Sequence, residues 1–114
     1  MNGKKSEEED EKIGENKRDD IIFEVIDKTG RKIRLTKTQW THIREFHEHV
    51  EDIEEIILTL QKADKIIVDE REDVNYFFKH FKHKNHISKF LKVIVKYLNE
   101  EGIVLSAHFV RNIR

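Results

Sequence analysis

Apolar positions recur with the period of a β-strand at two places near residue 30. Residues 21–26 (IIFEVI) form a short β-rich run, and residues 31–36 (RKIRLT) alternate polar and apolar side chains. The residues between them, 27–30 (DKTG), are typical of a turn. This pattern predicts a β-hairpin over residues 21–36.

The next two segments show helical spacing. Thr36 and Gln39 match a capping box, in which both side chains satisfy free amides at a helix start. After this box, apolar or aromatic side chains recur three or four residues apart, at Trp40, Ile43, His47 and Val50. A second helix is predicted from a stripe with acidic residues opposite it, formed by Ile53, Ile56, Ile57 and Leu60, and it ends near residue 63 or 64.

The rest of the chain is rich in strand patterns. Residues 74–81, 90–98 and 103–110 are predicted strands, and residues 66–68 a further short one. The last two long strands form a hairpin through residues 99–102 (NEEG). Alternation places one set of side chains from each of these two strands on the face toward the helices. The first strand contributes Leu91, Val93, Val95 and Tyr97, and the second contributes Ile103, Leu105, Ala107 and Phe109. The opposite face carries Lys92, Ile94, Lys96, Ser106 and His108.

These elements predict an α+β fold. We expect an N-terminal β-hairpin and two helices packed on one face of a mainly antiparallel sheet of about four strands, in a single domain over residues 21–114. Residues 1–20 hold the acidic run EEEDE and one lone aliphatic side chain, Ile13. Because so few apolar groups cannot offset the entropy of ordering, we expect a disordered acidic tail there.

Charge and composition narrow the classes of function. Residues 74–114 carry eight Lys and Arg against two Asp and Glu, a net charge of +6, whereas residues 1–20 and 21–73 carry −3 and −4. A basic half of this kind is typical of a polyanion site, although it also fits simple charge complementarity within one fold. No cysteine is present, and no apolar run is long enough to cross a membrane. We expect a cytoplasmic protein without membrane contact, and the Lys, Glu and Ile usage is typical of a thermophile.

Histidine is the residue type with the most chemical potential, because its pKa lies near neutrality. RNA cleavage requires a base for the 2′-hydroxyl proton, an acid for the leaving oxygen and a cation near the phosphate. His108, a second histidine and Lys96 can supply these parts, with Ser106 on the same strand face as His108. The plainer interpretations are a solvated surface histidine for His108 and a hydrogen-bonded core histidine for His47.

Two other patterns bear on ligands. Tyr76, Phe77, Phe78 and Phe81 interleave with cations, which suits base stacking on single-stranded RNA, although half of such aromatics usually belong to a core. The predicted RNA contacts are Lys79, His80, Lys82, Lys92 and Arg111. Neither His80, His83 and His86 nor His42, His47 and His49 match an established metal spacing, so no metal and no cofactor is predicted. No glycine-rich phosphate loop or nucleophile elbow is present.

Taken in order, several of these motifs resemble the phage-type nucleases of the BECR superfamily (Barnase–EndoU–Colicin–RelE-like). The resemblance covers about residues 21–112 and rests on the segments IRLT (33–36), QWTHI (39–43), HE (47–48), VIVK (93–96) and LSAH (105–108). It implies helices on one side of an antiparallel sheet and metal-independent RNA cleavage in toxin or phage-conflict settings. By position, His42 and His47 match the helix histidines, Lys96 the basic residue and Ser106 the hydroxyl residue of such nucleases.

Three positions differ from the pattern of these nucleases. Phe46 stands where an arginine commonly precedes the second histidine, His49 stands near a usual Pro-Glu turn, and His108 stands where tyrosine is frequent. The prediction is therefore a metal-independent endoribonuclease with His42, His47, Lys96, Ser106 and His108 in its site, and RNA as its partner. The resemblance also implies an antitoxin or immunity protein as a partner. The alternative is a non-catalytic module of the same fold that binds RNA or a partner protein.

Overall fold

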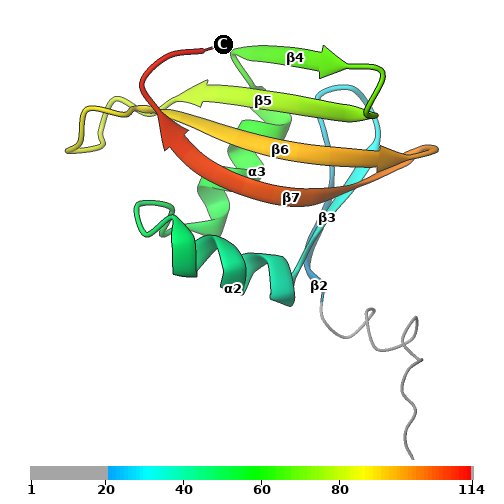
Figure 1. Cartoon of the computed structure of the whole chain (residues 1–114), viewed down its shortest axis with the longest axis horizontal. Helices are drawn as coiled ribbons and strands as arrows, with labels where there is room; N and C mark the ends of the chain where they lie inside the picture. Colours follow the sequence, from blue (N-terminus) through cyan, green and yellow to red (C-terminus); the bar gives the residue numbers. More distant parts are fainter. Residues whose placement is uncertain (1–20, 114) are drawn as a thin grey trace, which may run out of the picture.

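The computed structural model describes residues 21–113, so the predicted tail over residues 1–20 lies outside the described part. The element order is β2 (Ile21–Ile26), β3 (Lys32–Thr36), α2 (Lys37–Phe46), α3 (Ile53–Lys62), β4 (Lys65–Asp69), β5 (Val74–His80), β6 (Phe90–Leu98) and β7 (Glu101–Val110) (Figure 1). Each segment predicted as a helix or a strand contains an element of that type, although some of the ends differ. The α+β class is thereby confirmed.

The sheet is larger than predicted and is mixed. Six strands lie in the order β2-β3-β7-β6-β5-β4, and β3 runs parallel to β7 while every other pair is antiparallel. The prediction of a mainly antiparallel sheet of about four strands is therefore wrong. Periodicity reveals strands but not their neighbours, and here the N-terminal hairpin joins one edge of the sheet while β4 joins the other.

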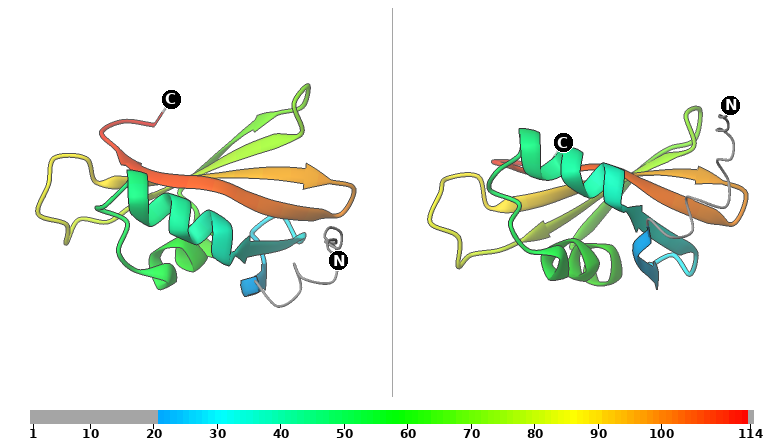
Figure 2. Two further views of the ribbon diagram at one scale, coloured as in Figure 1. Left: turned by 60° about the horizontal axis from the view of Figure 1, so that its bottom comes forward. Right: turned by 90° about the horizontal axis from the view of Figure 1, so that it is seen from below.

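Both helices pack on the same face of this sheet (Figure 2). Ile43 from α2 and Ile56 and Leu60 from α3 are fully buried against the sheet. The predicted inward set of β6 is confirmed, since Leu91, Val93, Val95 and Tyr97 are all buried in this core. The other face of β5, β6 and β7 has no helix on it within the described residues, and it therefore leaves polar side chains accessible.

The predicted inward set of β7 is only partly correct. The register between β6 and β7 shifts at Ile94 and Val95, which pair with Ser106 and Val104, so Leu105 has no partner opposite it. This irregularity reverses the alternation upstream of it. Val104 is buried and Leu105 is exposed, whereas Ala107 keeps the predicted face.

Gly102 lies inside β7 and not in the predicted turn, because the turn closes on Asn99, which has φ of 62°, and Glu100. A Cβ atom at Gly102 would lie 2.6 Å from Ile33 Cδ1, 2.8 Å from Val95 Cγ1 and 2.9 Å from Tyr97 Cδ1. Such contacts are too short for carbon atoms. Because glycine has only a hydrogen atom in place of Cβ, Gly102 lets the N-terminal hairpin approach β7 closely.

Gly102→Val is expected to lower the free energy of unfolding by about 2–3 kcal/mol, because three packed side chains must move to admit the new one. Urea denaturation followed by circular dichroism measures this loss. The matched control is Glu101→Val, an exposed position next to it on the same strand; its surface ion pair with Arg34 is lost, so the expected change is at most about 1 kcal/mol. Equal stability of both variants would contradict the close packing at Gly102.

A buried carboxylate fastens the turn of the N-terminal hairpin. Asp27 is 4% exposed, and its Oδ1 accepts hydrogen bonds from Thr29 N (2.9 Å), Thr29 Oγ1 (2.7 Å) and Arg31 N (3.0 Å). Its Oδ2 accepts from the Tyr97 hydroxyl at 2.5 Å, and the Arg31 guanidinium lies 3.4 Å above the Tyr97 ring. Burial and the Asp27 carboxylate raise the pKa of Tyr97 well above its usual value. This cluster joins the hairpin to β6.

Both helices are short. Each of them has 10 residues. Within residues 21–113, no helix has the length and apolar character needed to span a membrane.

Candidate functional site

Helix α2 ends earlier than its hydrophobic spacing predicts. Thr36 Oγ1 accepts a hydrogen bond from Gln39 N (3.2 Å), as the capping box requires, but the last helical residue is Phe46. His47 is the C-cap, with φ of −137° and ψ of 72°. The prediction that His47 lies on the apolar stripe of a longer helix is therefore wrong. It stands in the loop at the end of the helix, where its ring is half-buried.

The loop after α2 is held by one side chain. Arg44 Nη1 donates to Glu48 O (3.1 Å) and to Val50 O (2.7 Å), and Val50 N donates to His47 O (3.0 Å). Cations near the last carbonyls of a helix are favourable because they complement the helix dipole. Arg44 therefore fixes the backbone that presents His47.

Helix α2 packs beside β7, and His47 meets a residue of that strand. The parallel strand β3 pairs with β7 only through Glu101–Ile103, so the C-terminal half of β7 has a free edge (Figure 1). At this edge the imidazole of His47 stacks on that of His108, with ring centroids 5.0 Å apart and an interplanar angle of 28°. The two histidines are 61 positions apart in the sequence, and only the packing of α2 on the sheet brings them together.

The His47–His108 pair opens onto a pocket of about 400 Å³. Three segments line it, namely the end of α2 with the loop after it, the loop between β5 and β6, and the end of β7. The lining residues are Phe46, His47, Glu48, His49, Val50, His86, Ile87, Ser88, His108 and Phe109. We call this the histidine pocket. Four of its ten lining residues are imidazoles, and Glu48 is its one carboxylate.

Burial favours the neutral form of the paired imidazoles. It lowers the pKa of His47, with a further contribution from His42, and it lowers the pKa of His108, with further contributions from His47 and Lys92. The Nδ1 atom of His108 is buried and has no hydrogen-bond partner in the described part of the chain. With Nδ1 buried, Nε2 is the nitrogen of His108 that a ligand could reach, and a neutral imidazole can act as a base.

A second histidine pair forms the far wall of the pocket. His49 stacks on His86 with centroids 4.3 Å apart, and His86 meets Phe109 edge to face at 5.0 Å. Both ring nitrogens of His86 are buried and unpartnered among residues 21–113. Burial lowers the pKa of His86, and His49, Lys84 and Lys89 lower it further. His49 is exposed on the loop after α2, and His86 lies in the loop between β5 and β6.

The loop that carries His86 is attached to α3 by a buried carboxylate. Glu55 is 8% exposed, and its Oε2 lies 2.8 Å from Lys84 Nζ and 3.4 Å from His83 Nε2. The helical pattern had predicted acidic residues on the solvent side of α3, and Glu55 departs from that pattern because the loop between β5 and β6 covers it. The ion pair positions His86 and Ile87 beside the end of α2.

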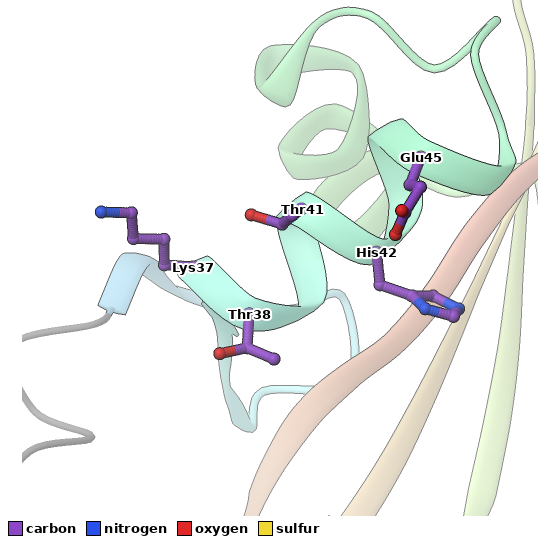
Figure 3. Close-up of a pocket in the computed structure, with 5 residues that line it drawn as sticks. All are labelled: Lys37, Thr38, Thr41, His42 and Glu45. Atoms are coloured by element: carbon purple, nitrogen blue, oxygen red, sulfur yellow. The ribbon is translucent and has the colours of Figure 1, made fainter.

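His42 lies one turn before the end of α2. Figure 3 shows its ring directed toward β7, while Lys37 and Thr41 point away from the strand. The hollow along this part of α2 is lined by exposed side chains alone, namely Lys37, Thr38, Thr41, His42 and Glu45. His42 is near enough to His47 to lower the pKa of His47 by charge repulsion. It therefore belongs to the rim of the His47–His108 pair, outside the pocket itself.

Of the two candidate lysines, only Lys92 lies near His108. Lys92 pairs with His108 across β6 and β7, whereas Lys96 pairs with Ile103, toward the other end of the sheet. The ammonium of Lys96 donates to the carbonyl of Glu72. Ser106 is half-buried on the same face as His108, two residues before it and opposite Ile94. The structure thus brings His47 and His108 into contact, with His42 close to His47 and Ser106 on the strand face of His108, and it leaves Lys96 away from them.

The predicted RNA contacts divide between the two faces of the sheet. Lys79 pairs with Leu91 on the helix side, while His80 pairs with Phe90 on the open side and Lys82 lies in the loop after β5. Phe90 in turn pairs with Val110, the residue before Arg111. His80 and Lys92 therefore lie at one end of the open face, the end that carries His108, and Arg111 follows β7 at that same end of the strand. Lys79 does not share that surface.

Most of the aromatic run in β5 belongs to the interior. Phe77, Phe78 and Phe81 are at most 5% exposed, so their predicted role in base stacking does not fit their burial. Tyr76 is half-buried on the open face, and the Lys92 ammonium lies 5.0 Å from its ring centroid. Tyr76 and Lys92 therefore remain available side by side on the open face, where Lys92 is opposite His108 and Tyr76 lies one strand further away.

The histidine pairs are not arranged as metal ligands. Within the described residues, no group of three or more His, Cys, Asp or Glu side chains has a geometry that could hold a metal ion. The stacked rings lie face to face, and imidazoles bind a metal through nitrogen lone pairs in the ring plane.

No family model, no curated protein and no solved structure matches this chain. The resemblance to the BECR superfamily therefore stays a prediction, and the side chains around the histidine pocket are the basis for a proposal about function.

Proposed function

We propose that this protein is a metal-independent endoribonuclease whose reacting groups surround the His47–His108 pair. The observation that carries the proposal is the pairing itself. Two imidazoles with pKa values lowered by burial lie 5.0 Å apart at a sheet edge that opens on a pocket, and a lysine pairs with one of them across the strands. Cleavage at the 2′-hydroxyl requires one group that accepts a proton and one that donates a proton, and two adjacent imidazoles can provide both.

The chemistry assigns a task to each group. One imidazole of the pair accepts the 2′-hydroxyl proton while the 2′-oxygen forms a bond to phosphorus. The other, protonated, donates to the 5′-oxygen as its bond to phosphorus breaks. Lys92 supplies positive charge beside the phosphate as negative charge develops on its oxygens. Ser106, on the same strand face, can donate a hydrogen bond to a phosphate oxygen.

Incubation of the purified protein with mixed RNA in EDTA, from pH 5 to pH 9, tests this proposal. The expected products are fragments with 2′,3′-cyclic phosphate ends, because the 2′-oxygen is the nucleophile. DNA of the same sequence lacks that oxygen and is expected to remain intact. No cleavage of RNA at any of these pH values by folded protein would exclude the nuclease function.

The pH profile of kcat/KM is expected to be bell-shaped, with its maximum below pH 6.5. This profile reports the free enzyme, in which the pKa values of His47 and His108 are both below the usual 6.5. The alkaline limb marks loss of the proton from the acid, so a lowered pKa moves that limb to lower pH.

Lys92→Ala provides the internal test of that profile. Removing the ammonium takes away one cause of the lowered pKa of His108, so the limb that His108 governs should move to higher pH even as the rate falls. His83→Gln, at an exposed histidine that contacts Glu55, is the control and should leave the profile unchanged. A maximum above pH 7 in the wild-type protein would argue against the His47–His108 pair as acid and base.

A second candidate function is RNA binding without cleavage. The observation that favours it is the lowered pKa of both paired histidines, since two neutral imidazoles at pH 7 leave no strong acid. Lys92 beside Tyr76 on the open face provides a cation and an aromatic ring for a single strand. Salt-dependent RNA binding by the wild-type protein, with no fragments at any pH, would favour this candidate. The antitoxin or immunity partner rests on the family resemblance alone.

A further inference from the structure

Phe46 is exposed to a degree that is unusual for an aromatic side chain. It is 64% exposed, and it is the one aromatic residue of residues 21–113 among the large apolar side chains that face solvent. One side of its ring packs against His42, with centroids 4.8 Å apart. As the last residue of α2, Phe46 directly precedes His47. An aromatic ring is thus presented to solvent beside the His47–His108 pair.

Ile87 provides a second exposed apolar group at the same pocket. It is 69% exposed and lies in the loop between β5 and β6, which the Lys84–Glu55 ion pair attaches to α3. Phe46 and Ile87 come from segments 41 positions apart, and both line the histidine pocket. Single exposed apolar residues are ordinary on protein surfaces, but two at one pocket mark a contact site.

The charge around this apolar pair favours a polyanion. Lys89 lies close enough to His86, and Lys92 to His108, to lower the pKa of each imidazole, whereas Glu55 pairs with the charge of Lys84 and Glu48 is the one carboxylate that lines the pocket. The Lys84 ammonium also lies 5.2 Å from the ring centroid of Phe109, which lines the pocket. A ligand that combines a flat apolar surface with adjacent negative charge suits these surroundings, and a nucleotide has that composition.

We propose that Phe46 and Ile87 hold one unpaired nucleobase of the RNA, with the base stacked on the Phe46 ring and the adjoining phosphate at the His47–His108 pair. This inference rests on the proposed function for the position of the phosphate. It defines the substrate as single-stranded RNA or a loop, because a base inside a duplex is stacked on both faces and cannot reach Phe46 without being extruded. Phe46 is then a binding residue and not an acid or a base.

Binding of a 2′-O-methyl single-stranded oligonucleotide tests the base contact without cleavage, because the blocked 2′-oxygen cannot attack. Fluorescence anisotropy with a labelled mixed-sequence oligonucleotide gives Kd for each variant. Phe46→Ala is expected to raise Kd about tenfold, in line with the loss of one stacked base. Ile87→Ala should raise Kd by a smaller factor, about threefold.

Two further variants make the result specific. Phe46→Trp preserves a ring and should keep Kd within about twofold of the wild type, with Trp fluorescence quenched on binding. Leu98→Ala removes an apolar side chain that is 79% exposed at the end of β6, away from the pocket, and should leave Kd unchanged. Equal Kd values for Phe46→Ala and the wild type would overturn the base contact, as would a duplex that binds as tightly as the single strand.

Cleavage assays separate this inference from the proposed function. On unmodified RNA, the wild-type protein should cleave a single strand at least tenfold faster than the same strand in a duplex, and Phe46→Ala should reduce kcat/KM for the single strand about tenfold. If Phe46→Ala cleaves as fast as the wild type, and a duplex is cleaved as fast as a single strand, the base contact is refuted while the nuclease function stands. Phe46-dependent binding without any cleavage would refute the nuclease and support the base contact.

Discussion

His108→Ala is expected to reduce kcat for RNA cleavage at least 100-fold while the protein stays folded. A positioned acid or base contributes about 10²–10⁴-fold to a proton-transfer reaction, and His108 is one of the two imidazoles that can serve here. Its side chain is only half-buried and its Nδ1 atom makes no hydrogen bond within the described residues. Removing the side chain therefore disturbs little packing and breaks no hydrogen bond, so we expect the substitution to lower activity and not stability.

Single-turnover cleavage of a labelled RNA in EDTA measures this effect, with circular dichroism as the test of folding. His47→Ala should produce a loss of similar size. The double variant should lose little more than either single one, because residues that act as a unit are not additive. His83→Gln serves as the matched control and should retain full activity. Retention of more than a tenth of the wild-type kcat by folded His108→Ala protein would exclude His108 as acid or base.

Asp27→Ala is expected to destabilise the fold by about 3 kcal/mol, although Asp27 lies far from the histidine pocket in sequence and contacts none of its residues. The substitution removes four hydrogen bonds, from Thr29 N, Thr29 Oγ1, Arg31 N and the Tyr97 hydroxyl. Buried donors that lose a charged acceptor cost about 1–3 kcal/mol each, and solvent recovers part of this at the turn. For a protein of this size the total stability is about 5–15 kcal/mol, so the loss is large.

Thermal unfolding at pH 7 should show a decrease in Tm of about 15 °C for Asp27→Ala, since about 4–8 °C corresponds to 1 kcal/mol in a small domain. Glu24→Ala changes an exposed carboxylate on β2 and should move Tm by no more than about 2 °C. Tyr97→Phe removes one of the four hydrogen bonds and should fall between the two. A Tm for Asp27→Ala within 3 °C of the wild type would show that the cluster contributes little to stability.

The local elements were accessible to sequence reasoning because their signals are local. Period-two runs marked β2, β3, β6 and β7, and the Thr36 cap marked the start of α2. Two errors came from effects beyond a single segment. The irregularity opposite Ile94 and Val95 shifts the faces of β7 upstream of Ala107, and Glu55 is buried by a loop that lies 28 to 29 positions away in the chain.

The candidate site shows the same division. The sequence supplied the residue types, and it singled out His42, His47, Ser106 and His108. The sequence analysis placed Lys96, and not Lys92, beside the phosphate. Both lysines share one strand face, and only the register of β6 against β7 shows that Lys92 is opposite His108. Phe46 attracted notice as a departure from a family pattern. Its exposure beside the pocket became visible only in three dimensions.

The amino-acid sequence by itself determined where helices and strands form, which side of β6 faces the core, and that imidazoles and lysines are concentrated in and around the final strands. Tertiary structure decided the size of the sheet, the parallel pairing of β3 with β7, the ending of α2 at Phe46 and the meeting of His47 with His108. The physical reason is the distance along the chain over which each effect acts. Periodicity and capping act over a few residues, whereas strand neighbours and pocket walls depend on packing between segments that are tens of residues apart.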